Sequence, residues 1–105
     1  MRKILVISAL ILGSASTAFA SDAEDICGQL SMSSEQIMNA RLEGVSIIDS
    51  MKAAGEGDNP SSRLLKLTVR EAYSEPAYTG ENEKQTAIKE FGIKKYLECM
   101  DYLNK

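Results

Sequence analysis

The chain has 105 residues, enough for one domain with a modest core, and carries 12 lysines and arginines against 15 aspartates and glutamates. It contains no histidine, and this removes the commonest general base, the commonest metal ligand and every nucleophile activated by a neighbouring imidazole. The acidic balance disfavours binding to nucleic acid and to anionic lipid.

Residues 1–20 have the pattern of a secretory signal peptide. A short basic start precedes an apolar run over residues 4–12, and a small-x-small motif ends at Ala20. We therefore predict cleavage after Ala20, export to the periplasm, and a single domain over residues 21–105 with a net charge of −5. An uncleaved membrane anchor is the alternative, but the apolar stretch is short and weakly polar in its second half. No cysteine stands at the cleavage point to carry a lipid.

Cys27 and Cys99 are the only cysteines of the chain. Exported chains usually pair an even number of cysteines, and two cysteines allow one intramolecular disulfide. The bond would close a loop of about 73 residues and stabilise the domain by about 4 kcal/mol in the chain-entropy model. Redox catalysis would favour a close Cys-x-x-Cys pair, which the sequence lacks. We predict a structural disulfide.

The first two helices are predicted from apolar spacing and from their end signals. Residues at intervals of three and four predict a helix over residues 23–43, and Gly44 is a natural C-terminal stop. Ser46 then suits the N-cap of a short second helix of about nine residues, with Gly55 closing it. Its apolar residues are Ile47, Ile48 and Met51.

Two further helices are predicted after the polar loop at residues 56–59. Pro60 suits the first position of the third helix, with Asn59 as its N-cap and Pro76 as its limit. Residues 74–80 form a connector, and a final helix follows from about Glu81. The stripe expected to face inward on the third helix comprises Leu64, Leu67, Thr68, Glu71 and Ala72, widened by Leu65, Val69 and Tyr73. That of the final helix comprises Ala87, Ile88, Phe91, Gly92, Lys95, Tyr96, Cys99, Met100 and Leu103.

The predicted fold class is all-α, a small disulfide-stapled bundle of about four helices after a cleaved signal peptide. No segment alternates as a strand would. Because Cys27 lies early in the first helix and Cys99 late in the last, the disulfide requires those two helices to lie side by side and roughly antiparallel. The two middle helices must then cover the remaining side of the pair formed by the first and last helices. A domain of this size has little room for a deep internal pocket.

Three residues are candidates for interaction. Arg41 falls on the inner stripe of the first helix, so its guanidinium needs a carboxylate or backbone carbonyls as partners. Tyr73 and Tyr78 flank the end of the third helix and are either packed anchors with satisfied hydroxyls or an exposed aromatic patch. The acidic residues lie in exposed polar runs, and the loop at residues 56–59 lacks the ligand pattern of an EF-hand. We therefore expect no catalytic residue, no metal site and no cofactor.

Several short motifs occur in a recognisable order along the chain: Cys27, Arg41, Gly44, Ala72-Tyr73 with Pro76, and Tyr96-Leu97-Glu98-Cys99. In this order the sequence resembles a group of small exported two-cysteine helical proteins of Gram-negative bacteria and their phages. No function is assigned to that group, so the resemblance implies architecture and export only. The layout is also similar to that of phage-encoded periplasmic lysozyme inhibitors and periplasmic acid-stress chaperones, a likeness of architecture alone.

These observations predict a periplasmic protein that is not an enzyme and acts by binding another protein, such as an envelope enzyme. The alternative is an acid-stress chaperone, because protonation of the excess carboxylates would partly unfold the domain below about pH 4 and expose surface for clients. No stable membrane anchor is expected in the mature protein. The sequence leaves the oligomeric state open.

Overall fold

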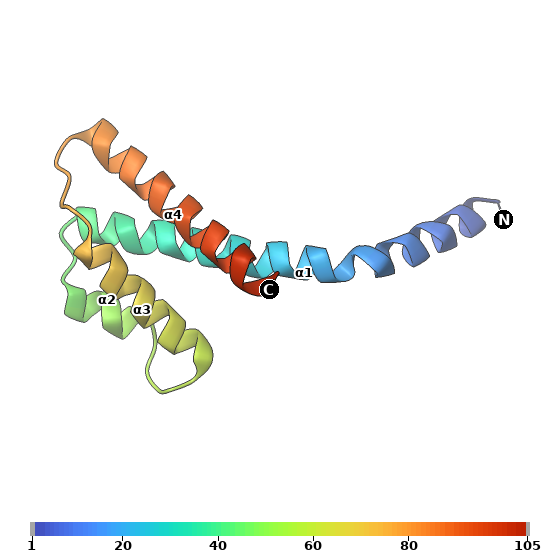
Figure 1. Cartoon of the computed structure of the whole chain (residues 1–105), viewed down its shortest axis with the longest axis horizontal. Helices are drawn as coiled ribbons and strands as arrows, with labels where there is room; N and C mark the ends of the chain where they lie inside the picture. The colour runs from blue at the N-terminus through green and yellow to red at the C-terminus, as the bar shows by residue number, and fades with distance from the viewer. Residues whose placement is uncertain (1, 105) are drawn as a thin grey trace.

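The structure, a computed structural model, describes the backbone of residues 2–104 and the side chains of residues 22–104. It contains four helices and, within residues 2–104, no strand, which confirms the all-α prediction (Figure 1). In chain order they are α1 (Arg2–Leu42), α2 (Ile47–Ala53), α3 (Pro60–Ser74) and α4 (Glu81–Leu103). The sequence predicted that the first helix begins at residue 23, and this is wrong, because α1 is continuous from Arg2. The predicted signal peptide covers residues 1–20, whose side chains lie outside the described part of the chain, so it stays a prediction.

Gly44 ends α1 as predicted. Its φ of +92° places it in the left-handed region, which glycine adopts without the strain of a side chain. The Gly44 N–H donates to the Arg41 carbonyl at 3.3 Å, and the Val45 N–H donates to the Ala40 carbonyl at 3.0 Å. This pair of bonds is a Schellman motif, which satisfies carbonyls at the helix end that would otherwise lack partners.

The predicted N-caps of α2 and α3 are also present. The Ser46 hydroxyl accepts a hydrogen bond from the Asp49 N–H at 3.1 Å. The Asn59 side chain accepts one from the Ser62 N–H at 2.8 Å, and Pro60 occupies the first turn, where its missing N–H costs nothing. Local sequence signals therefore determine where both helices begin.

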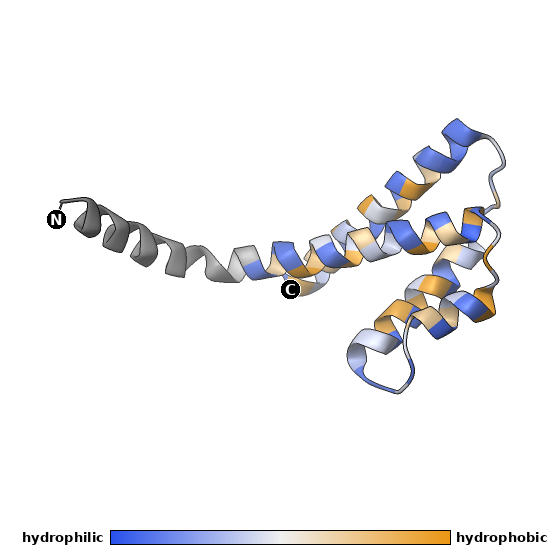
Figure 2. Cartoon of the chain, turned by 180° about the vertical axis from the view of Figure 1, so that it is seen from behind, coloured by the Kyte–Doolittle hydropathy of each residue, from blue (hydrophilic) through white to orange (hydrophobic). Residues whose placement is uncertain are grey.

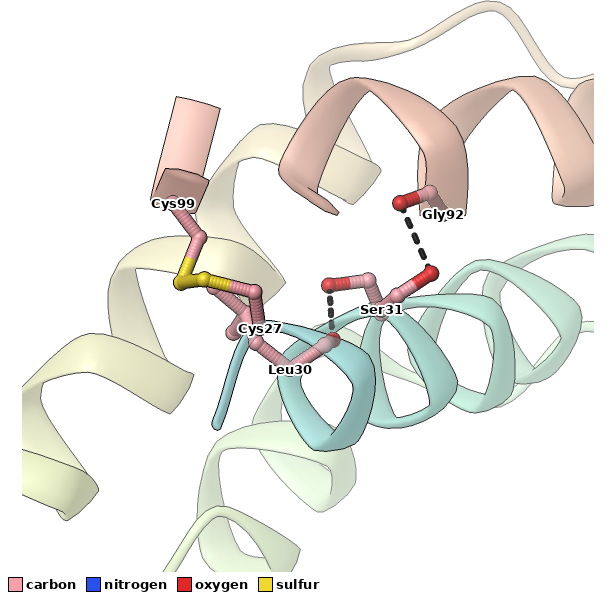
Figure 3. Close-up of a disulfide and its surroundings, with 6 residues drawn as sticks. Cys27, Leu30, Ser31, Gly92 and Cys99 are labelled. Carbon is pink, nitrogen blue, oxygen red and sulfur yellow. Dashed lines mark hydrogen bonds between the residues drawn. A yellow bond between two sulfur atoms is a disulfide. The ribbon is translucent and has the colours of Figure 1, made fainter. Parts of the chain in front are cut away.

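The predicted disulfide between Cys27 and Cys99 joins α1 to α4, with the two Cα atoms 5.5 Å apart (Figure 3). The two helices run antiparallel and make the most extensive helix contact of the domain (Figure 1). Midway along their contact, the Ser31 hydroxyl donates to the Gly92 carbonyl at 2.9 Å. A Cβ atom on Gly92 would lie 2.6 Å from Cγ of Glu35, so the absence of a side chain here allows the close approach.

The apolar core lies toward the C-terminal end of α1. A cluster of buried side chains joins α1, α3 and α4, and burial of such side chains supplies most of the folding free energy. The cluster consists of Met38, Leu42, Ala72, Ile88 and Phe91, with Ile37, Tyr73 and Ala87 packed against it.

Small polar residues are buried where α3 crosses α1. Ser34 and Thr68 are completely buried, and each hydroxyl donates to a carbonyl of its own helix, that of Leu30 at 2.6 Å and that of Leu64 at 2.9 Å. These local bonds satisfy the hydroxyls without a cross-helix partner. The small volume of the two side chains allows the helices to approach closely.

Helix α2 packs mainly on α3 and leaves Ile47 and Ile48 exposed. Its buried residue is Ser50, whereas Ile47 is 41% exposed and Ile48 is 65% exposed. Figure 2 shows hydrophobic segments on α2 and α3 as well as on α1 and α4. The side of α2 that contains Ser50 is the side that meets the neighbouring helices.

Candidate functional site

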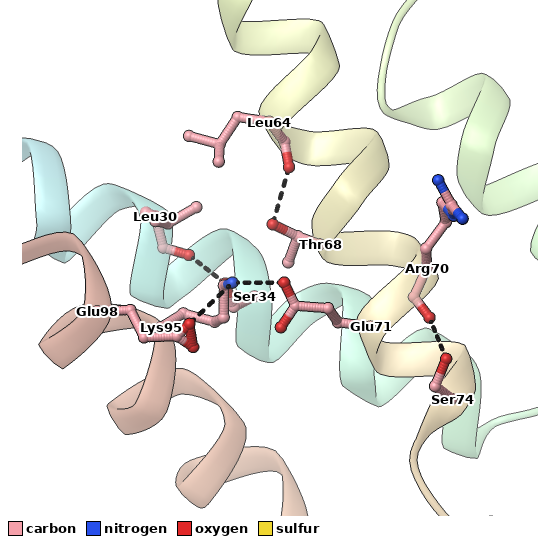
Figure 4. A network of polar contacts seen from close by, with 9 residues as sticks. All are labelled: Leu30, Ser34, Leu64, Thr68, Arg70, Glu71, Ser74, Lys95 and Glu98. Carbon is pink, nitrogen blue, oxygen red and sulfur yellow. Dashed lines mark hydrogen bonds and ion pairs between the residues drawn. The ribbon is translucent and has the colours of Figure 1, made fainter. Parts of the chain in front are cut away.

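A partly buried ion pair connects α3 to α4. The ammonium group of Lys95 lies 2.8 Å from a carboxylate oxygen of Glu71 and 3.6 Å from one of Glu98 (Figure 4). The Lys95 side chain is 8% exposed, whereas those of Glu71 and Glu98 are 39% and 48% exposed. The positive charge is therefore enclosed by the protein, and the two carboxylates face solvent at the surface.

Beyond this ion pair, the side of α3 that faces α4 is uncovered. Leu64, Leu67 and Glu71 follow one another at intervals of three and four residues, so they lie on one side of α3. Figure 4 shows Leu64 and Glu71 extending from the side opposite to Arg70. Leu64 is 45% exposed and Leu67 is 53% exposed.

The sequence-based prediction that Leu64 and Leu67 face the core is therefore wrong. Within residues 22–104, α3 and α4 each pack on α1, and neither makes an extensive contact with the other. The middle helices consequently do not close the bundle beside α4. A pair of leucines that a fully closed bundle would bury is left at the surface.

Between α3 and α4 lies an open hollow of about 220 Å³, which we call the α3–α4 groove. Its floor comes from α1 and its walls come from the start of α3 and from the disulfide. The lining residues are uncharged: Ile26, Gln29, Leu30, Ser33, Ser61, Leu64, Leu65 and Cys99. The hollow is bordered mainly by α1 and α3, and its apolar members could receive apolar side chains of an amphipathic helix, as in helix-in-groove recognition.

Two of the candidate interaction residues, Arg41 and Tyr73, come together where α1 and α3 end. The Arg41 guanidinium carbon lies 5.3 Å from the centroid of the Tyr73 ring, and Nη2 donates to the Glu75 carbonyl at 3.5 Å. The backbone-carbonyl partner expected for Arg41 is present, while its Nε is buried without a protein partner. The arrangement is a cation–π contact at a helix C-terminus, where positive charge is favoured.

Tyr73 is a packed anchor with a satisfied hydroxyl. Its hydroxyl donates to the Val45 carbonyl at 2.6 Å and lies 2.8 Å from the Ser50 hydroxyl, which must then act as the donor. The ring thereby connects α3 to the turn before α2 and to α2 itself. Of the two alternatives for this tyrosine, the packed one holds.

Tyr78 lies apart from that cluster and is 36% exposed. It borders a second open hollow, of about 330 Å³, between the connector and the first half of α4. Two carboxylates, Glu83 and Glu90, line the same hollow. Tyr73 and Tyr78 therefore do not form a shared aromatic patch.

Residues 22–104 hold no group of three or more acidic or cysteine side chains placed to bind a metal ion. Within the described part of the chain, no helix is long and apolar enough to cross a membrane. The disulfide is typical of an oxidising, extracytoplasmic compartment. No protein-family model, curated protein or solved structure matches the chain.

Proposed function

We propose that this protein is exported to the periplasm and acts by binding an amphipathic helix of another protein in the α3–α4 groove. The observation that supports the proposal is the exposure of Leu64, which lines the groove beside Cys99, and of Leu67 on the same side of α3. Exposed apolar groups that line one hollow, with polar residues around them, characterise interaction sites more than scattered apolar residues do. A docked helix would cover the leucines as a further member of the bundle.

The charges at the rim indicate which helix the groove accepts. Glu71 lies one turn beyond Leu67 on α3, and Glu98 directly precedes Cys99 on α4. Both carboxylates are partly exposed, whereas Lys95 between them is enclosed, so α3 and α4 present mainly negative charge to solvent near the groove. The predicted mature chain, with a net charge of −5, has the same sign. Complementarity favours a partner helix with leucine-like side chains on one face and lysines or arginines beside them.

The experiment compares three forms of the oxidised protein: the wild type, the double variant Leu64→Ser/Leu67→Ser, and Met32→Ser as the matched control. Met32 is 64% exposed and lies on α1, outside the groove. Each form is immobilised and exposed to periplasmic extract, and the retained proteins are identified. We expect one protein to be retained by the wild type and the control and lost by the double variant. Equal retention by all three forms would exclude the groove.

Synthetic helical peptides test the preference for positive charge. One peptide carries leucines at helical spacing with lysines beside them, a second has glutamates in place of the lysines, and a third has glutamines. We expect the lysine peptide to bind at least about tenfold more tightly than the glutamate peptide, a difference of about 1.4 kcal/mol. Equal binding of the three peptides would contradict the preference for positive charge and would still be consistent with binding in the groove. Failure of all three would count against the groove itself.

A further inference from the structure

Helix α4 has a second apolar stripe, which begins on the side away from α1 and ends at Met100 and Leu103, where it borders an open hollow against the start of α1. Ile93, Leu97 and Leu103 are 56%, 57% and 42% exposed, and Met100 between them is half-buried. Their spacing of four, three and three residues places all four on one side of the helix. Because single exposed apolar residues are ordinary, the informative feature is their alignment over three turns. We call these four residues the outer α4 stripe.

Two opposite charges border this stripe on the same flank. Lys94 and Asp101 are seven residues apart, which is almost two full turns, so they lie about 10 Å apart along the helix axis. Neither takes part in an ion pair among residues 22–104. When two copies of α4 pair antiparallel about a point between Leu97 and Glu98, Lys94 of each helix faces Asp101 of the other. A two-fold axis makes that pairing twice.

We propose that the outer α4 stripe binds the same stripe of a second copy, in a two-fold antiparallel dimer. The occupant is a second copy because the stripe and its flanking charges complement themselves under this symmetry. Contact over eleven residues of one helix is about 16 Å long, and it buries less surface than the roughly 800 Å² per partner of a stable interface. The dimer is therefore weak and forms as protein concentration rises.

This surface is independent of the proposed function. Lys95 and Glu98, which form the ion pair with Glu71 of α3, lie on the side of α4 opposite to Ile93 and Leu97, as their positions along the helix require. A dimer of this kind leaves the groove of each copy open. Two grooves in one particle would bind a partner that carries two suitable helices more tightly than a single copy does.

Sedimentation velocity of the purified, oxidised protein over a wide range of concentration tests the dimer. We expect a reversible monomer–dimer equilibrium in the wild type and in the control Met32→Ser. In Leu97→Ser we expect the dissociation constant to rise at least about tenfold. Circular dichroism of each variant establishes that α4 is retained, since Leu97 lies on the surface.

Reversal of the charges tests the antiparallel arrangement. Lys94→Asp and Asp101→Lys should each weaken the dimer, because each places like charges opposite one another, and the double variant Lys94→Asp/Asp101→Lys should restore it. A protein that stays monomeric at every concentration would overturn the proposal. So would a dimer that persists in Leu97→Ser, or one that is lost in Leu64→Ser/Leu67→Ser, since the second copy would then occupy the groove.

Discussion

The two ends of the bundle are held together by different means. At the end where α1 terminates, which we call the packed end, Met38, Leu42 and Phe91 belong to a buried cluster. At the other end, the open end, the Cys27–Cys99 bond holds α1 and α4 beside the α3–α4 groove. There Ile26 and Leu64 are 56% and 45% exposed. A covalent bond can hold helices where apolar side chains are kept free for another use.

The largest expected effect comes from removing the covalent bond at the open end. We expect Cys27→Ser/Cys99→Ser to lose about 4 kcal/mol of unfolding free energy, because the bond closes a long loop in the unfolded chain. Urea denaturation measures the loss, and hydrogen exchange should show the open end losing protection first. A loss below about 1 kcal/mol would mean that packing alone holds that end.

Removing an aromatic ring at the packed end should cost slightly less. Phe91 is 2% exposed, and we expect Phe91→Ala to lower the free energy of unfolding by about 3 kcal/mol through lost burial and a residual cavity. Leu97→Ala on the same helix is the matched control and should cost less than about 1 kcal/mol, since the side chain is already half in water. Equal losses would contradict the assignment of inner and outer faces to α4.

The ion pair between the two ends should respond differently to the loss of either partner. Glu71→Gln leaves Lys95 enclosed with Glu98 as its remaining partner, and we expect a loss of about 1 to 2 kcal/mol. Lys95→Met replaces the buried charge by an apolar chain of similar length and should be nearly neutral. Urea denaturation of both variants measures the difference. A larger loss for Lys95→Met would show that the attraction between the charges exceeds the cost of burying Lys95.

The smallest effect is expected from a single hydroxyl. Tyr73→Phe removes the bonds to Val45 and Ser50, and we expect a loss of about 1 kcal/mol. Tyr78→Phe is the control, for which the free energy of unfolding should be unchanged, since this tyrosine is partly exposed. Thermal unfolding of the two variants distinguishes them. A loss in Tyr78→Phe equal to that in Tyr73→Phe would contradict the different environments of the two rings.

The sequence predicted the end of α1, the starts of α2, α3 and α4, and the disulfide, because those depend on local chemistry or on simple counting, whereas the predicted start of the first helix at residue 23 was wrong. Gly44 must adopt a left-handed conformation, Asn59 precedes a proline, and two cysteines can pair in one way. Each of these signals involves a few neighbouring residues. The same holds for the carbonyl partner expected for Arg41, because a buried guanidinium requires one.

The groove could not be predicted from the sequence, because the spacing of apolar residues on one helix does not show whether another helix covers them. Leu64 and Leu67 have the spacing of core residues and are exposed only because α3 and α4 both pack on α1. Thr68, which lies on the predicted inner stripe of the same helix, is buried at that crossing together with Ser34. A signal that could have suggested this is the run of small residues at the contact, since small side chains allow two helices to approach closely.

The distance along the chain between the two cysteines also has a consequence for folding kinetics. Residues 27 and 99 are 72 positions apart, whereas α2 and α3 are joined by a short loop. Closing the long loop costs more entropy, so we expect the hairpin of α2 and α3 to form early and the pairing of α1 with α4 to form last. Formation of the disulfide in a refolding chain would then report the arrival of the last helix.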